Sequence, residues 1–144
     1  MVLAYDTQNV FAKILRGELP AQKVFEDQTA LAFMDIMPRA EGHVLVIPKK
    51  AARGLLDIDA WTLGNLIKRV QHVAIGVQKA TGADGLTLQQ FNEAAGGQVV
   101  FHLHFHILPR WDGVALKPPG IMGDAVKLKE NADRIRAAIE PFKG

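Results

Sequence analysis

The sequence predicts a single α+β domain built on a mostly antiparallel sheet. Residues 59–81 carry an apolar stripe with the three- and four-residue spacing of an amphipathic helix. Short apolar segments of strand length form two groups, one before and one after this helix. Strands grouped around one long helix indicate the α+β class.

The first third of the chain is expected to form a short helix and three strands. Residues 9–16 predict the helix, which Asn9 can cap and which the segment GELP at 17–20 ends. Residues 22–27 and 29–35 predict a hairpin around a short polar turn. A loop at 37–42 then leads into a buried strand at 43–48, which Pro48 stops.

The remaining elements follow the long helix. Asp59 can cap that helix, and Gly82 follows its end. A strand is predicted at 86–92, a flexible glycine-rich loop at 93–98, and a histidine-rich strand at about 100–108 that Pro109 stops. A loop at 117–120 precedes a C-terminal helix at 124–140, with Asp124 as its cap.

Composition fits a globular cytoplasmic protein. The 144 residues include 17 Lys and Arg, 15 Asp and Glu, and no cysteine, so disulfides are excluded. So small a basic excess does not indicate a nucleic-acid partner. No signal peptide is expected, and no window approaches the roughly 20 apolar residues of a membrane span. We expect one domain over 1–144, with a core at about 9–110 and a C-terminal extension at 111–144.

The segment FHLHFHILPR at 101–110 holds three of the five histidines, at every second position. Because successive side chains of a strand point to opposite faces, His102, His104 and His106 are expected to share one face. The intervening residues are expected to share the opposite, core face: Phe101, Leu103, Phe105 and Ile107.

Three interpretations of the histidine face are open. It can be a solvated strand surface. It can bind zinc, although His102 and His106 on a regular strand would have Cα atoms about 13 Å apart at ~3.3 Å per residue, so His43 or Asp35 would be needed as a further ligand. It can act on phosphorus, because neutral imidazole is a nucleophile near pH 7 and the loop at 94–98 can present backbone N–H groups to an anion.

The segment HLHFHIL at 102–108 resembles the signature of the histidine triad (HIT) family, Hint-like branch, over its whole length. The resemblance covers residues 9 to about 110, with 91–98 similar to the family's phosphate loop. It implies a homodimer whose sheets join across the interface. It also implies purine-nucleotide binding and hydrolysis at the α-phosphorus of phosphoramidates or dinucleoside polyphosphates. It further implies a nucleotidyl-histidine intermediate, the release of a nucleoside monophosphate, and no requirement for a cofactor or metal.

The resemblance also implies residue roles. His104 corresponds to the nucleophile, flanked by His102 and His106, and His43 supports the triad. Transferase relatives carry glutamine at the third position of the triad, so His106 indicates a hydrolase. Asp35 corresponds to the carboxylate that binds the ribose hydroxyls. The phosphate side is assigned to Asn92, Gly97 and Gln98. The apolar slot for the base is assigned to Phe11, Ile14, Leu19, Phe33 and Ile36.

The chain departs from the family pattern at two places. Relatives often carry Ser or Thr after the loop glutamine, where this chain has Val99. Some relatives bind a structural zinc through a Cys-x-x-Cys pair, where this chain has Asn9 and Ala12. Two alternatives remain beside the hydrolase: a metal-dependent hydrolase using His102, His104 and His43, and a nucleotide-binding regulator whose turnover is incidental.

Overall fold

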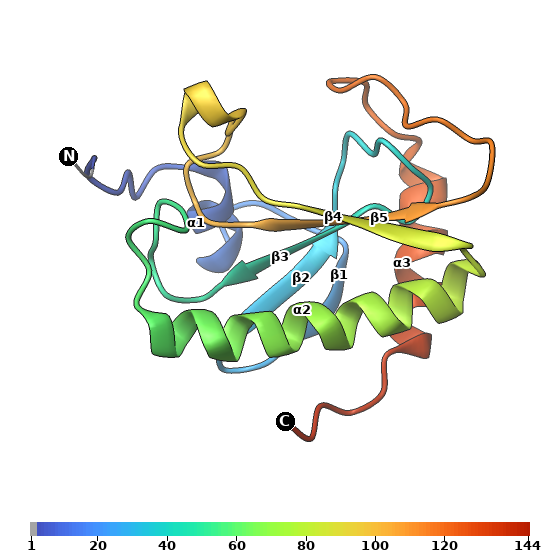
Figure 1. Ribbon diagram of the computed structural model, residues 1–144, viewed down its shortest axis with the longest axis horizontal. Helices are drawn as coiled ribbons and strands as arrows, with labels where there is room; N and C mark the ends of the chain where they lie inside the picture. The colour runs from blue at the N-terminus through green and yellow to red at the C-terminus, as the bar shows by residue number, and fades with distance from the viewer. Residues whose placement is uncertain (1–2) are drawn as a thin grey trace.

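The computed structural model describes residues 3–144 and confirms the α+β class (Figure 1). Five strands form one antiparallel sheet in the order β1-β2-β3-β5-β4. The elements are α1 (Val10–Leu15), β1 (Lys23–Glu26), β2 (Ala30–Met34), β3 (Val44–Pro48), α2 (Ala60–Thr81), β4 (Gly85–Gln89), the 3-10 turn η1 (Ala94–Gly96), β5 (Phe105–Arg110) and α3 (Ala125–Ala138).

The predicted helix caps are confirmed. Asn9 accepts a hydrogen bond from the N–H of Ala12, and Asp59 accepts one from the N–H of Thr62. Asp124 caps α3 in the same way. Gly82 ends α2 in the left-handed conformation, with φ 64°, which glycine adopts without steric cost.

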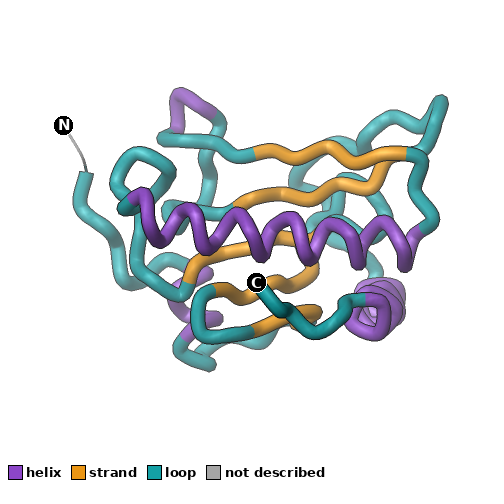
Figure 2. The backbone as a smooth tube through the Cα atoms, turned by 60° about the horizontal axis from the view of Figure 1, so that its bottom comes forward, coloured by secondary structure: helices purple, strands orange, loops and turns teal. Residues whose placement is uncertain are grey.

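The sheet is covered on both faces, so β2 and β3 are buried at every position. Alternate residues of these strands enter two separate hydrophobic clusters. The larger cluster packs the sheet against α2 and α3, and the smaller one packs it against α1 (Figures 1 and 2). The sheet face that packs against α1 therefore has a core of its own: Phe11, Leu31, Phe33, Leu45 and Ile47.

The histidine strand is shorter at its start than predicted. β5 begins at Phe105, because the preceding backbone leaves the ladder and the N–H of Leu103 bonds instead to the carbonyl of Ala52 at 2.8 Å. Pro109 does not stop the strand, which continues to Arg110. Beyond Ile107 the strand pairs with β4 alone, and such a local edge tolerates a residue without an N–H.

In the sequence, His72 falls with Asn65 and Lys68 on the polar side of the long helix, which predicts a solvated ring. The structure corrects this prediction, because the C-terminal tail packs along α2 and β1 and covers the ring. The His72 ring is half-buried between Phe25 and Phe142, and its Nε2 lies 2.5 Å from the carbonyl of Glu140. Gly76 permits this close approach, because a Cβ there would collide with Ile139.

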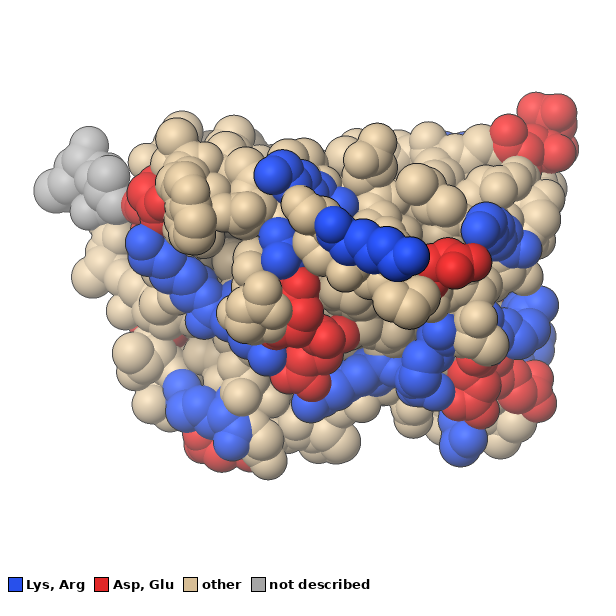
Figure 3. Space-filling model, turned by 90° about the horizontal axis from the view of Figure 1, so that it is seen from below, with Lys and Arg blue, Asp and Glu red and all other residues tan. Residues whose placement is uncertain are grey.

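The face seen from below carries interspersed basic and acidic side chains (Figure 3). Ion pairs among the described residues include Arg69 with Asp27 and Lys49 with Glu26. Within residues 3–144, no helix combines the length and apolar character needed to cross a bilayer.

Candidate active site

The triad lies at the end of the sheet where the N-terminal segment, α1, η1 and the start of β5 gather (Figure 1). Only His106 belongs to β5, whereas His102 and His104 lie in the irregular segment before it. Leu103, Phe105 and Ile107 enter the core as predicted. Phe101 does not: its ring carries the guanidinium of Arg53 at 4.2 Å.

The histidines are not a solvated strand surface. His102 is fully buried, and His104 is 8% exposed. The ring of Phe11, from α1, meets the ring of His104 edge-on with centroids 4.9 Å apart. The chain therefore places imidazoles between the sheet and a covering helix, where a polar group needs a specific partner.

Backbone carbonyls fix the hydrogen position on His104. Its Nδ1 lies 2.7 Å from the carbonyl of His102, and a carbonyl can only accept, so Nδ1 carries the hydrogen and Nε2 the lone pair. No residue within 3–144 bonds to His104 Nε2. Because the described residues hold no buried side-chain nitrogen without a partner, this Nε2 reaches solvent. The free lone pair is thus presented at the surface.

A second chain of hydrogen bonds runs from Arg39 through His43 to His106. The N–H of Arg39 donates to His43 Nδ1 at 3.1 Å, so the hydrogen of a neutral His43 sits on Nε2. That Nε2 lies 2.9 Å from His106 Nδ1 and donates to it. His106 then carries its own hydrogen on Nε2, where it can donate to a ligand. The His104 and His106 rings lie 4.9 Å apart.

The imidazoles are held neutral. Burial lowers the pKa of His43 to about 3, and the pKa values of His102 and His106 to about 4. The pKa of His104 also lies below its usual value, mainly because of burial. At pH 7 the site therefore offers one uncharged nucleophile and one uncharged donor.

His102 is held by two partners. Its Nε2 lies 2.9 Å from the carbonyl of Pro48, and its Nδ1 lies 2.5 Å from the hydroxyl of Tyr5. Tyr5 is a site residue that the sequence analysis missed. It lies 97 positions from its partner, and no motif or periodicity marks it.

Asp35 follows β2 and lies beside His43. Its Oδ2 is 3.5 Å from His43 Nε2, and its Oδ1 accepts from the N–H of Met37 at 2.8 Å. Burial raises the pKa of the carboxyl group. The side chain is 19% exposed, so an external hydroxyl can reach it, and its role toward ribose stays a prediction.

The predicted apolar slot is only partly assembled. Phe11 and Phe33 lie in the α1 cluster with ring centroids 5.3 Å apart, and Ile14 packs against this cluster. Leu19 is 40% exposed and Ile36 is 52% exposed, and neither belongs to the cluster. A contact of these two residues with a base stays a prediction.

The side chains of Gln98 and Asn92 hold the loop at 91–98 in place. Gln98 is 4% exposed, and its amide bonds to the backbone of Arg53, Glu93 and Val100. Asn92 accepts from the N–H of Leu55 at 2.7 Å and pairs with the amide of Gln90. These two side chains therefore shape the loop, and any contact of theirs with phosphate stays a prediction.

The backbone of this loop is strained and internally bonded. Glu93 has φ 62°, and Arg53 holds its carboxylate through two nitrogens at 2.7 and 2.9 Å. The N–H of Gly97 donates to the carbonyl of Ala94, so in this conformation it is not presented to an anion. Val99 follows as an 84% exposed residue outside any strand.

Three groups could hold a metal ion, but they are not the three histidines named for the metal-dependent alternative. His102 has both ring nitrogens engaged, so it does not join His104 and His43. The structure instead brings together Asp35, His43 and His106, with ligand atoms within 4.8 Å of one another. In the tautomers described above, the nitrogens of His43 and His106 that face this cluster share one hydrogen.

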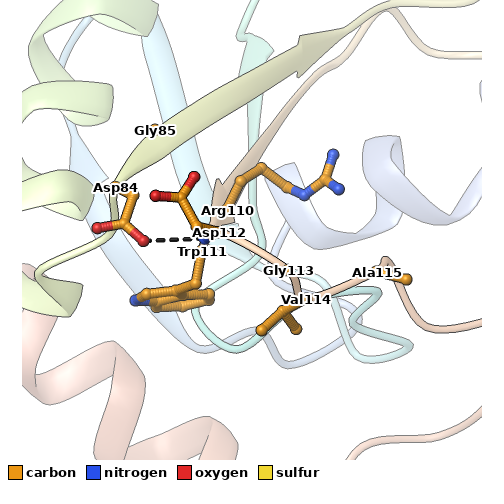
Figure 4. A pocket seen from close by; sticks show the side chains of 8 residues that line it. All are labelled: Asp84, Gly85, Arg110, Trp111, Asp112, Gly113, Val114 and Ala115. Carbon is orange, nitrogen blue, oxygen red and sulfur yellow. Dashed lines mark hydrogen bonds between the residues drawn. The ribbon is translucent and has the colours of Figure 1, made fainter.

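A separate hollow of about 520 Å³ lies at the opposite end of β4 and β5 (Figure 4). Arg110, Trp111 and Asp84 line it, and the N–H of Asp112 donates to Asp84 at 2.9 Å. No predicted site residue lines this hollow, so the triad and the hollow are different places.

Comparison with known proteins agrees with this geometry. The family model described as HIT domain matches residues 16–113. The chain belongs to the HIT family. It is 54% identical to a Hit-like protein from Bartonella henselae, described as involved in cell-cycle regulation and crystallised with an unknown ligand. That structure has a TM-score of 0.90, with 94% of this chain and 99% of the other covered.

Two named enzymes are among the relatives of this HIT protein. It is 41% identical to the adenylylsulfatase HINT3 of Arabidopsis thaliana over 131 residues, which are 90% of this chain and 66% of that protein. It is 36% identical to the adenosine 5'-monophosphoramidase hnt1 of Schizosaccharomyces pombe over 101 residues, which are 70% of this chain and 73% of that protein.

Proposed function

We propose that this protein is a nucleotide hydrolase that cleaves at the α-phosphorus of purine nucleoside phosphoramidates or related nucleotides. The observation that carries the proposal is the pair of free Nε2 atoms, a lone pair on His104 and a hydrogen on His106. The names of the two enzyme relatives support the same reaction class, since both act on adenosine 5'-phosphate derivatives.

The reaction proceeds by double displacement. The Nε2 lone pair of His104 attacks phosphorus, the bond from phosphorus to the leaving group breaks, and a nucleotidyl-histidine forms. The carbonyl of His102 accepts from Nδ1–H and stabilises the positive charge that develops on the ring. Water then attacks the adduct, which releases the nucleoside monophosphate and restores neutral His104.

His106 supplies the hydrogen-bond donor. Its Nε2–H donates to a phosphoryl oxygen or to the departing atom, and His43 keeps the hydrogen on that nitrogen. Asp35 binds the ribose hydroxyls, and the surface beside Phe11 and Phe33 receives the base. A homodimer formed along β4 and α2 completes the proposal, because both elements expose large apolar residues. These include Leu86, Leu88, Ile67 and Ile75.

A metal-dependent hydrolase is the second candidate, favoured by the cluster of Asp35, His43 and His106. Binding an ion there would remove the hydrogen that His43 shares with His106. Activity that is lost with a chelator and restored by zinc would support this candidate.

The test is a product assay with adenosine phosphoramidate, adenylylsulfate and diadenosine polyphosphates, each with and without EDTA. We expect AMP release from at least one substrate, unchanged by EDTA, and its loss in His104→Ala. His72→Ala is the matched control, because that histidine lies on α2 away from the triad. Tight AMP binding without AMP release from any substrate would instead favour a nucleotide-binding regulator.

A further inference from the structure

The N-terminal segment before α1 is fixed across the triad end of the sheet. Arg53 Nη1 donates to the carbonyl of Ala4 at 3.4 Å, and Arg16 Nη1 donates to the carbonyl of Thr7 at 2.6 Å. Between these two anchors, the half-buried ring of Tyr5 meets the ring of His102 edge-on, with centroids 5.6 Å apart. The segment thus delivers one phenol to one buried imidazole.

The direction of the Tyr5 hydrogen bond follows from the other partner of His102. The carbonyl of Pro48 can only accept, so His102 Nε2 carries the hydrogen. In neutral His102 the Nδ1 atom is then an acceptor, and the hydroxyl of Tyr5 donates to it at 2.5 Å. Burial raises the pKa of Tyr5, which keeps the phenol in its donating form.

The ring of His102 needs its bonds to Pro48 and Tyr5 because its backbone is not held by the sheet. The segment before Phe105 has left the ladder, and the N–H of Leu103 bonds to the carbonyl of Ala52. The carbonyl of His102 in turn accepts the Nδ1–H of His104 at 2.7 Å. A shift of the His102 ring therefore moves the group that orients His104.

We propose that Tyr5 is a positioning residue, which holds His102 and, through the His102 carbonyl, the nucleophile His104. This proposal rests on the proposed function for its kinetic consequence, but the hydrogen bond from Tyr5 to His102 can be tested without turnover. Tyr5 contacts neither the nucleophilic Nε2 nor any other reacting atom, so it acts only through His102.

Tyr5 also keeps a proton off His102. A bond donated to the neutral form lowers the pKa of a base, so we expect loss of the hydroxyl to raise the pKa of His102. Burial is the main reason that the pKa of His102 is low; the carbonyl of Pro48 and the charge of Asp57 favour protonation of the ring, and His104 opposes it. Removal of the hydroxyl should therefore move the acid limb of the kcat profile to higher pH.

The test compares Tyr5→Phe with Thr7→Ala, a change in the same segment whose side chain does not contact the triad. We expect Tyr5→Phe to lower kcat about 5- to 50-fold with little change in KM, which is the effect of losing one buried hydrogen bond to an oriented group. Its acid limb should move to higher pH. Thr7→Ala should match the wild type in kcat, KM and pH profile.

Imidazole ¹⁵N NMR gives the readout that does not depend on activity. In the wild type, His102 should show the Nε2–H tautomer with a hydrogen-bonded Nδ1, and in Tyr5→Phe this Nδ1 signal should move to the position of an unbonded nitrogen. An unchanged signal, or equal kinetic losses in both variants, would overturn the proposal. Inactivity of the wild type on every substrate, with the expected NMR change, would overturn only the proposed function.

Discussion

His43 has two hydrogen bonds that can be removed separately, and this allows a sharp test of the tautomer argument. An asparagine at position 43 places its oxygen near the site of Nδ1, where it can accept from Arg39. A glutamine reaches further and can place its amide N–H near the site of Nε2, where it can donate to His106. His43→Asn therefore keeps the loop bond, and His43→Gln keeps the bond to the triad.

The expected magnitude follows from the buried acceptor on His106. If His43 no longer donates, His106 Nδ1 is left without its partner, at a cost of about 1–3 kcal/mol. If that cost falls on the transition state, kcat drops about 5- to 150-fold. We expect His43→Asn to show this loss and His43→Gln to keep most of the wild-type kcat.

The assay is steady-state hydrolysis of adenosine phosphoramidate, with thermal unfolding measured in parallel. His43→Gln should lose more stability than His43→Asn at the 37–43 loop, because the N–H of Arg39 then loses its acceptor. The reasoning is refuted if His43→Asn turns over as fast as His43→Gln, since the donor to His106 would then be irrelevant.

Three further predictions concern stability, assembly and the leaving group. As the pH is lowered from 6.5 to about 4, the free energy of unfolding should fall, by at most about 1.4 kcal/mol per pH unit for each buried histidine, measured by denaturant titration. In this range the unfolded chain binds protons that folded His43, His102 and His106 do not, so stability rises with pH; a flat profile would contradict their depressed pKa values. The protein should be a dimer at micromolar concentration by light scattering, and Leu88→Glu should shift it toward monomer, whereas a monomeric wild type would disprove the proposed interface. Val99→Ser should accelerate substrates with poor leaving groups more than those with good ones, because a hydroxyl there can donate to the departing atom; equal rate changes would show that residue 99 does not face it.

The features that local chemistry determines were predictable from the sequence. Asn9, Asp59 and Asp124 cap the helices as expected, because a short polar side chain before an apolar repeat has one favourable role. The period of 59–81 placed α2 within one residue at its start. The triad motif led to the correct family, because three imidazoles at alternate positions serve few other purposes.

Features that depend on contacts between distant segments were not predictable. The alternation of apolar residues continues through 100–108, but Leu103 bonds to Ala52 before the strand begins. Tyr5 has no local signal because its partner is 97 residues away. His72 looked solvated from the helix period, since nothing in that period shows that the tail returns to cover it.

The most direct test of the account is to locate the covalent intermediate. Turnover of a slowly hydrolysed nucleotide substrate is stopped with alkali, because the P–N bond of a nucleotidyl-histidine survives alkali but is cleaved in acid. The peptide that spans residues 101–110 is then analysed by mass spectrometry at neutral or alkaline pH. The account predicts a nucleotidyl group on His104, and no adduct in His104→Ala. An adduct on His102 or His106, or steady turnover without any adduct, would contradict the assignment of His104 as the nucleophile.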